Sequence, residues 1–148
     1  MAADNSLHML LNLEQQREDK LVQEFALAQA QLRQQEQKLA GLEQYRMDYL
    51  RQLQNRGQEG IHSLQYGHYH GFVGKLDQGI QQLHSSLVGV RNAVEQRRQR
   101  WLAQRRKKDA IAHLLEQRAE RAQKLADRRE QRQLDEFAST RRLRAQTR

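Results

Sequence analysis

The sequence predicts an all-α protein, a two-helix antiparallel coiled-coil hairpin with a long C-terminal helical overhang. Apolar residues recur at alternating spacings of three and four on both sides of a short interval, Asn55 to Gly60, that carries two glycines. This repeat is typical of helices that pack along one seam, and a short glycine-bearing connection lets two of them fold back together. The chain has no proline, and only 37% of its residues are hydrophobic, which is too few for a layered core.

The length of 148 residues suits one domain. Three N-cap candidates, Asp4, Asn5 and Ser6, precede the first apolar repeat. We expect a single coiled-coil domain over residues 1–148, with a first helix at about 5–55, a turn at about 55–60, a second helix at about 61–137 and a frayed basic tail at 138–148.

The first helix carries a nearly continuous apolar seam. Its members are Leu21, Phe25, Ala28, Leu32, Leu39, Leu42, Tyr49 and Leu53. Gln35 and Arg46 interrupt this seam, and polar residues at such positions fix the register between paired helices at some expense of stability.

The second helix repeats the pattern and then weakens. Its seam contains Tyr66, Tyr69, Val73, Leu76, Ile80, Leu83, Leu87, Val90, Val94 and Trp101, and the later interruptions are Arg97, Gln104, Lys108 and Arg118. Five glycines lie in the same helix: Gly67, Gly71, Gly74, Gly79 and Gly89. We expect them to face solvent. The alternative is a close approach by a partner backbone or a local distortion.

The position of the turn sets the register. With a turn near Gly57, facing residues have numbers that add up to about 115, which places Leu7 opposite Lys108. Residues beyond His113 then have no partner within the hairpin. The basic helix formed by these residues would have marginal stability on its own, so we interpret it as an element that docks onto a partner.

Composition argues against several classes of protein. The absence of cysteine excludes disulfides and thiolate chemistry. No secretory signal and no long apolar span is present, so we expect a cytoplasmic protein. No phosphate-binding loop or acyl-transfer motif occurs, and His68 and His70 diverge on a helix. We therefore expect no enzyme activity, no cofactor and no metal.

Positive charge is concentrated late in the chain, because residues 91–148 carry 18 Lys and Arg against eight Asp and Glu. The run from Arg97 to Lys108 allows a basic coiled-coil nucleic-acid-binding protein as an alternative. A basic helix that faces a protein partner is favoured, since acidic residues are interspersed. A homo-oligomeric coiled coil that uses the same seams between chains is left open.

Aromatic residues near the turn form the most informative surface. Tyr45 and Phe72 fall outside the seam and are expected to form an exposed patch, which typically marks a partner site. The patch also includes Leu42, Tyr49, Tyr69, Leu76 and Gly79.

These residues carry a resemblance. The patterns Leu42-x-x-Tyr45-x-x-x-Tyr49, Tyr69-x-x-Phe72-x-x-x-Leu76 with Ile80, and Leu134-Asp135-Glu136-Phe137-Ala138 occur in this order. With them, nearly the whole chain resembles the FliJ family of the bacterial flagellar type III export apparatus. The glycine density at residues 67–79 departs from that family.

The resemblance implies a central stalk or adaptor at the cytoplasmic face of the inner membrane. The patch near the turn would contact a FlhA-type export gate, and the paired termini would contact the hexameric export ATPase. The residues expected at the ATPase ring are Leu7, Leu11, Arg118, Arg121, Leu125, Arg128, Arg129 and Phe137. Export chaperones are further implied partners, whereas specific nucleic acid and membrane insertion are not.

Overall fold

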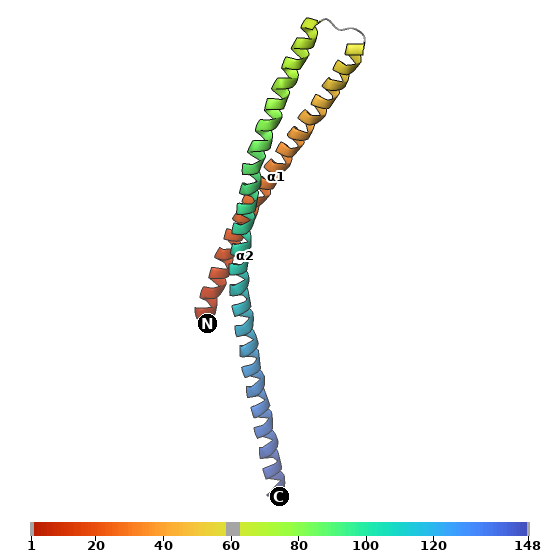
Figure 1. Cartoon of the computed structure of the whole chain (residues 1–148). Coiled ribbons are helices and arrows are strands. Elements are labelled where there is room, and N and C mark those ends of the chain that lie inside the picture. The colour runs from red at the N-terminus through yellow and green to blue at the C-terminus, as the bar shows by residue number, and fades with distance from the viewer. Residues whose placement is uncertain (1, 59–62, 148) are drawn as a thin grey trace. The chain divides into compact units, whose positions relative to one another are not determined.

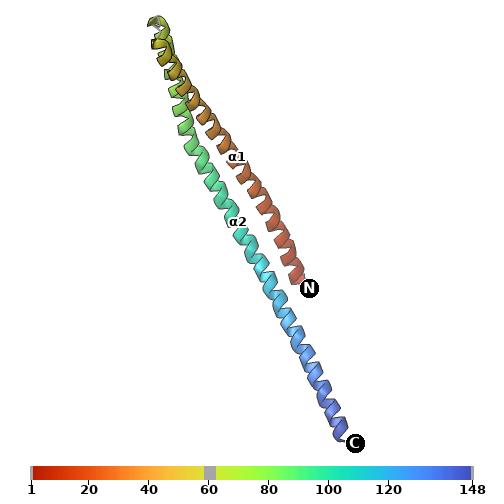
Figure 2. The same ribbon diagram turned by 90° about the vertical axis from the view of Figure 1, so that its right-hand side faces the viewer.

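Two long α-helices make up the part of the chain that the computed structural model describes, residues 2–58 and 63–147. Helix α1 spans Ala2–Gln58 and helix α2 spans Ser63–Gln146. Side chains are described for residues 2–56 and 67–147. The two helices run antiparallel and pack against each other (Figures 1 and 2). The predicted all-α hairpin is therefore confirmed.

The chain divides into two compact units, and both helices pass through both of them. The hairpin unit is Asp19–Ala103, and the terminal unit combines Met1–Glu18 with Gln104–Arg148. Each unit thus contains one stretch of α1 beside one stretch of α2.

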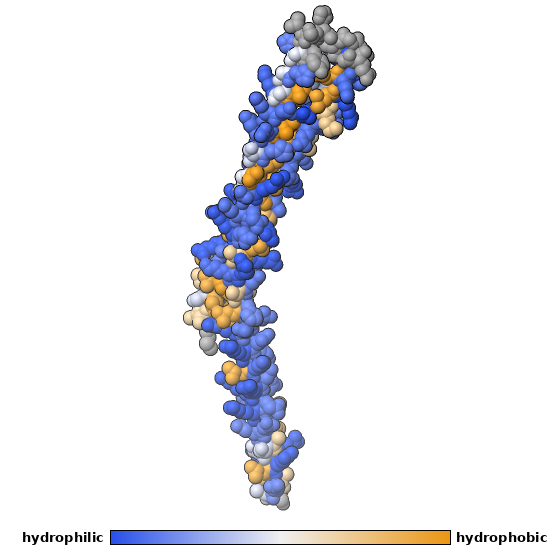
Figure 3. All heavy atoms as spheres, viewed as in Figure 1, coloured by the Kyte–Doolittle hydropathy of each residue, from blue (hydrophilic) through white to orange (hydrophobic). Residues whose placement is uncertain are grey.

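Apolar side chains fill the seam of the hairpin unit. The buried hydrophobic residues are Ala28, Leu39, Leu53, Val73 and Leu87, and all of them occupy predicted seam positions. Figure 3 shows apolar atoms in a line along this part of the chain. Their burial stabilises the pairing by removing apolar surface from water. The predicted position of Tyr66 lies outside the side chains that are described.

The terminal unit has a paired part and an overhang. Arg118 of α2 still contacts Asp4 near the start of α1. From Glu116 to Gln146 every side chain of α2 is exposed. The predicted C-terminal overhang is present, and within the described residues it has no second helix along its seam.

The helices extend further than the sequence predicted. Helix α1 begins at Ala2, so Ser6 lies inside it and is not its N-cap: the Ser6 hydroxyl donates to the Ala2 carbonyl oxygen at 3.0 Å, as an interior serine does. Helix α2 continues to Gln146, past the end that the sequence predicts at about residue 137, so the residues of the expected basic tail up to Gln146 are helical. No glycine or proline follows Gly89 to end the helix.

The register also differs from the expectation. Helix α1 passes through Gly57 to Gln58, so the expected turn at residues 55–60 began too early; residues 59 and 60 lie outside the described residues. The pairing is displaced accordingly. Lys108 contacts Glu18, and not a neighbour of Leu7, while Arg118 contacts Asp4. Pairing therefore continues past His113 before the overhang begins.

The glycines of α2 face open space. A Cβ atom added at Gly67, Gly71, Gly74, Gly79 or Gly89 would meet no atom within 4 Å. Solvent-facing glycines are the favoured interpretation, and it is confirmed for the exposed Gly67, Gly71, Gly74 and Gly89, whereas Gly79 is half-buried. No close approach within the described residues requires glycine at these positions.

Candidate partner-binding surfaces

Four aromatic rings from the two helices form one cluster in the hairpin unit, the aromatic cluster of Tyr45, Tyr49, Tyr69 and Phe72. The ring centroid of Tyr49 lies 4.8 Å from that of Phe72 and 5.1 Å from that of Tyr69. Tyr45 meets Phe72 edge-on at 6.1 Å. These distances are within the range of favourable aromatic pairs. The helix repeat places Tyr45 and Tyr49 one turn apart on α1, so both reach α2.

The cluster has a buried side and an exposed side. Tyr49 and Tyr69 are half-buried in the seam, whereas Tyr45 is 50% exposed and Phe72 is 36% exposed. The distinction between seam and off-seam aromatics that the sequence predicted is therefore confirmed. Two large apolar rings remain partly open to a partner on a surface that is otherwise mostly polar.

The cluster also has its own electrostatics. Burial raises the pKa of the Tyr49 phenol above its ordinary value, and the neighbouring Tyr69 and Tyr45 add to this effect. The guanidinium of Arg56 lies 5.6 Å from the centroid of the Tyr69 ring and donates a hydrogen bond to its hydroxyl. Arg56 therefore holds the Tyr69 ring in place at the side of the cluster nearer the end of α1.

The remaining predicted residues of this surface are Leu42, Leu76 and Gly79. All three are half-buried. A salt bridge from Arg46 to Asp77 joins the two helices next to them. The seam interruption at Arg46 is thereby explained by a specific cross-helix partner.

The residues expected at an ATPase ring all lie in the terminal unit. Leu7 and Leu11 are half-buried in the seam between α1 and α2. The exposed members on the overhang are Arg121, Leu125, Arg128, Arg129 and Phe137. Arg118 is held by Asp4 at 3.3 Å. The structure thus provides basic and apolar side chains on one exposed helix, while two of the predicted leucines face inward.

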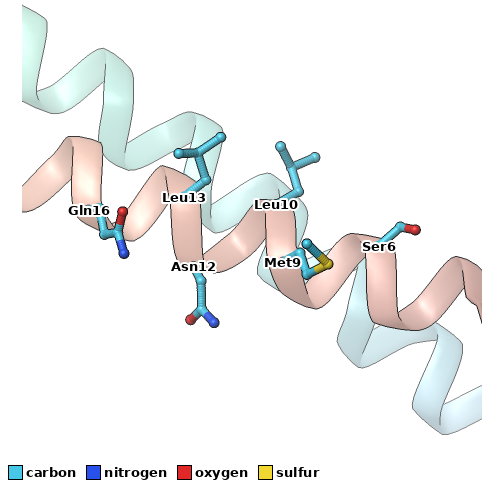
Figure 4. A pocket seen from close by; sticks show the side chains of 6 residues that line it. All are labelled: Ser6, Met9, Leu10, Asn12, Leu13 and Gln16. Atoms are coloured by element: carbon cyan, nitrogen blue, oxygen red, sulfur yellow. The ribbon is translucent and has the colours of Figure 1, made fainter.

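A second apolar face on α1 was missed. Met9 is 73% exposed, and Leu10 and Leu13 are also exposed. They line a surface pocket together with Ser6, Asn12 and Gln16. Figure 4 shows Leu10 and Leu13 pointing to the same side of α1. The signal was present in the sequence, because residues 7–13 are apolar on more than one side of the helix.

A polar layer crosses the seam of the terminal unit. It consists of Glu14 and Glu18 of α1 with Gln104 and Lys108 of α2, and both glutamates are buried. The Gln104 amide donates to the Glu14 carboxylate and, at 3.0 Å, to the Glu14 backbone oxygen. Lys108 Nζ lies 2.6 Å from Glu18 Oε2. Extending the predicted α1 seam upstream by seven residues would have found both glutamates.

The basic run at residues 97–108 has intramolecular partners. In the hairpin unit Trp101 stacks on Phe25, so its ring is not free to stack on a base. Arg98 pairs with Glu95 at 3.1 Å. In the terminal unit Lys108 belongs to the polar layer. These contacts favour the protein-facing interpretation of the run over nucleic-acid binding.

Metal ligation and membrane insertion have no support in the residues described. Those residues include no group of three or more His, Asp or Glu side chains placed to hold a metal ion. Within the same part of the chain, neither helix contains a segment both long and apolar enough to span a bilayer.

Fold and surface together define a long antiparallel helical hairpin with exposed aromatic and basic patches. The chain belongs to the FliJ family, since the family model described as "Flagellar FliJ protein" matches residues 3–147. It is therefore a component of the flagellar protein-export apparatus, in a family of structural or adaptor components. No curated protein and no solved structure matches the chain.

Proposed function

We propose that this protein is a non-enzymatic central stalk and adaptor of the flagellar export machinery. In this role the terminal unit binds the hexameric export ATPase, and the aromatic cluster binds the cytoplasmic part of a FlhA-type export gate. Export chaperones are further partners. The protein then acts at the cytoplasmic face of the inner membrane without inserting into it.

The exposed side of the aromatic cluster is the observation that carries the proposal. Tyr45 and Phe72 contact each other across the two helices, yet both rings stay partly exposed at the surface beside half-buried Tyr49. Aromatic residues of this kind dominate the binding energy of many interfaces. Because the neighbouring rings already hold them in place, binding would immobilise little additional side-chain freedom.

The character of the overhang supports the ATPase contact. Its side chains are exposed over the whole length from Glu116 to Thr147, and they combine arginines with Leu125 and Phe137. A helix that has no packing partner of its own gains stability when a partner covers its apolar residues. Arginine suits such an interface, because it pairs with carboxylates while its stem packs on apolar surface.

A binding measurement tests the gate contact. The double variant Tyr45→Ala/Phe72→Ala should bind a purified FlhA-type cytoplasmic domain at least roughly tenfold more weakly, as expected when two hot-spot rings are truncated. Leu27→Ala is the matched control, because Leu27 is 72% exposed in the same unit and lies away from the cluster. Circular dichroism should show unchanged helicity in both variants. Undiminished gate binding by the double variant would refute the assignment.

A separate measurement tests the ATPase contact. Reversing two cations, Arg128→Glu/Arg129→Glu, should reduce co-purification with the hexameric ATPase by roughly tenfold or more. The same reversal at Arg141→Glu/Arg142→Glu is the control, since these exposed arginines lie outside the proposed contact. Equal losses for both double variants would indicate only a general charge effect.

A further inference from the structure

The two units bury different kinds of side chain. All buried residues described in the hairpin unit are hydrophobic, whereas those described in the terminal unit are Glu14 and Glu18. Glu14 is 1% exposed and Glu18 is 9% exposed. In the terminal unit, therefore, carboxylates occupy seam positions that the hairpin unit fills with leucine, valine and alanine.

These carboxylates are held by groups on both helices. Glu14 accepts hydrogen bonds from Gln104 of α2 and from Arg17 of α1, the latter at 2.9 Å. Glu18 pairs with Lys108, whose ammonium also lies 3.9 Å from Asp109. Pairing of the helices here depends on directional contacts to charged groups, and removing one partner leaves a buried charge without compensation.

The apolar contribution in the same unit is small. Leu7 and Leu11 of α1, and Ile111 and Leu115 of α2, are only half-buried. Outside this seam α1 meanwhile exposes Met9, Leu10 and Leu13. Because this end of α1 has apolar side chains on two sides, apolar burial alone hardly determines which side packs against α2. The polar layer must therefore contribute much of the free energy that selects the observed side.

We propose that the terminal unit opens as an independent element, in which residues 2–18 separate from residues 104–118 while the hairpin unit stays paired, and that the polar layer controls this opening. Opening exposes Leu7 and Leu11, which are half-buried in the closed state, together with the outward face at Met9. The freed segment is then a helix with apolar side chains around much of its circumference. This inference does not rest on the proposed function.

Protonation of Glu14 is a second factor that regulates the opening of the terminal unit. Hydrogen bonding from Gln104 lowers the pKa of Glu14, with further contributions from Lys107 and Arg17, although burial acts in the opposite direction. A carboxylate with a lowered pKa in the folded state contributes stability that is present above its ordinary pKa and is lost as the pH falls through the lowered value. Acid therefore favours the open state, whereas the closed state is favoured at neutral pH.

Amide hydrogen exchange of the full chain tests the proposal. Lys108→Met removes the ammonium that pairs with Glu18, and the amides of residues 2–18 and 104–118 should then exchange at least roughly tenfold faster. Exchange within residues 28–53 and 73–94 should stay unchanged. Equal acceleration in both units, or no acceleration in the terminal unit, would overturn the proposal. Lys124→Met is the matched control, because Lys124 is exposed on the overhang.

A second variant keeps the test decisive if Lys108→Met disrupts folding generally. Replacing the ion pair by Glu18→Leu/Lys108→Leu removes both charges and restores an apolar seam, so exchange of residues 2–18 should become slower than in the unmodified protein. Faster exchange in this double variant would show that the polar layer does not control opening. In the unmodified protein, acidification should accelerate exchange in the terminal unit first, after correction for the intrinsic pH dependence of exchange.

Discussion

Phe25 of α1 and Trp101 of α2 stack with their rings nearly parallel, with ring centroids 5.6 Å apart and an angle of 18° between the ring planes. The pair joins the two helices of the hairpin unit close to its open end. Trp101 is the sole tryptophan of the chain. Its fluorescence therefore reports on this one cross-helix contact.

Removing the Phe25 ring should loosen the pairing at this point. We expect Phe25→Ala to shift the emission of Trp101 to longer wavelength and to lower the free energy of unfolding by about 2 kcal/mol, less than for a fully buried ring because both residues are half-buried. Fluorescence and chemical denaturation measure the two effects. Leu27→Ala should change neither, and an unchanged emission in Phe25→Ala would contradict the stacking.

The register can be measured by spin labelling, since the chain contains no cysteine of its own. Glu36 and Arg91 pair across the hairpin at 3.6 Å. Labels at these two positions should lie much closer together than labels at Glu24 and Arg91, because Glu24 and Glu36 are separated by about 18 Å along α1. A turn centred near Gly57 would place Glu24, and not Glu36, opposite Arg91. If the labels at Glu24 and Arg91 were instead the closer pair, the register with a turn at Gly57 would be correct.

The seam was predictable because it rests on periodicity alone. Leu39, Leu53 and Leu87 are buried at positions that the three–four spacing identifies. The register was not predictable in this way, since a coiled-coil repeat is compatible with pairings that differ by one heptad. Cross-helix partners such as Arg46 with Asp77 decide it, and they become evident only when both helices are placed.

The polar layer shows a second limit of the pattern. Gln104 and Lys108 look like the decay of an apolar stripe when α2 is considered alone. Opposite Glu14 and Glu18 they are matched donors. Likewise, Tyr45 and Phe72 could be placed off the seam from their spacing, but their edge-on contact depends on the register. The pattern within one helix thus identifies which of its faces is apolar or polar. The contacts between helices can be assigned only when the positions of both helices are known.

The aromatic cluster should make stability sensitive to alkaline pH. Burial and the neighbouring tyrosines raise the pKa of Tyr49 in the folded state. This group contributes stability that is fully present below the ordinary tyrosine pKa and is lost as the pH rises through the folded value. Thermal unfolding followed by circular dichroism should therefore show a declining midpoint temperature at alkaline pH.

The variant Tyr49→Phe identifies the group responsible. Phenylalanine cannot ionise, so the alkaline decline in midpoint temperature should become smaller in this variant. Tyr45→Phe is the comparison: it removes only one of the smaller contributions to the raised pKa of Tyr49, so it should reduce the decline less than Tyr49→Phe does. A decline that is reduced equally by both substitutions would assign the effect to the cluster as a whole.

The glycines of α2 provide the last prediction. Gly71 and Gly74 lie inside the helix, are exposed, and have room for a Cβ atom. Glycine is less favourable than alanine in a helix interior by about 0.8–1.0 kcal/mol, because it loses more backbone entropy on folding. The double variant Gly71→Ala/Gly74→Ala should therefore raise the free energy of unfolding by about 1–2 kcal/mol, measured by chemical denaturation.

Both positions are close to Phe72, so gate binding by the same variant is informative. If stability rises and gate binding is unchanged, the only effect of the two glycines is to lower the stability of this part of α2. A large loss of binding despite higher stability would instead show that a partner approaches the α2 backbone at these positions.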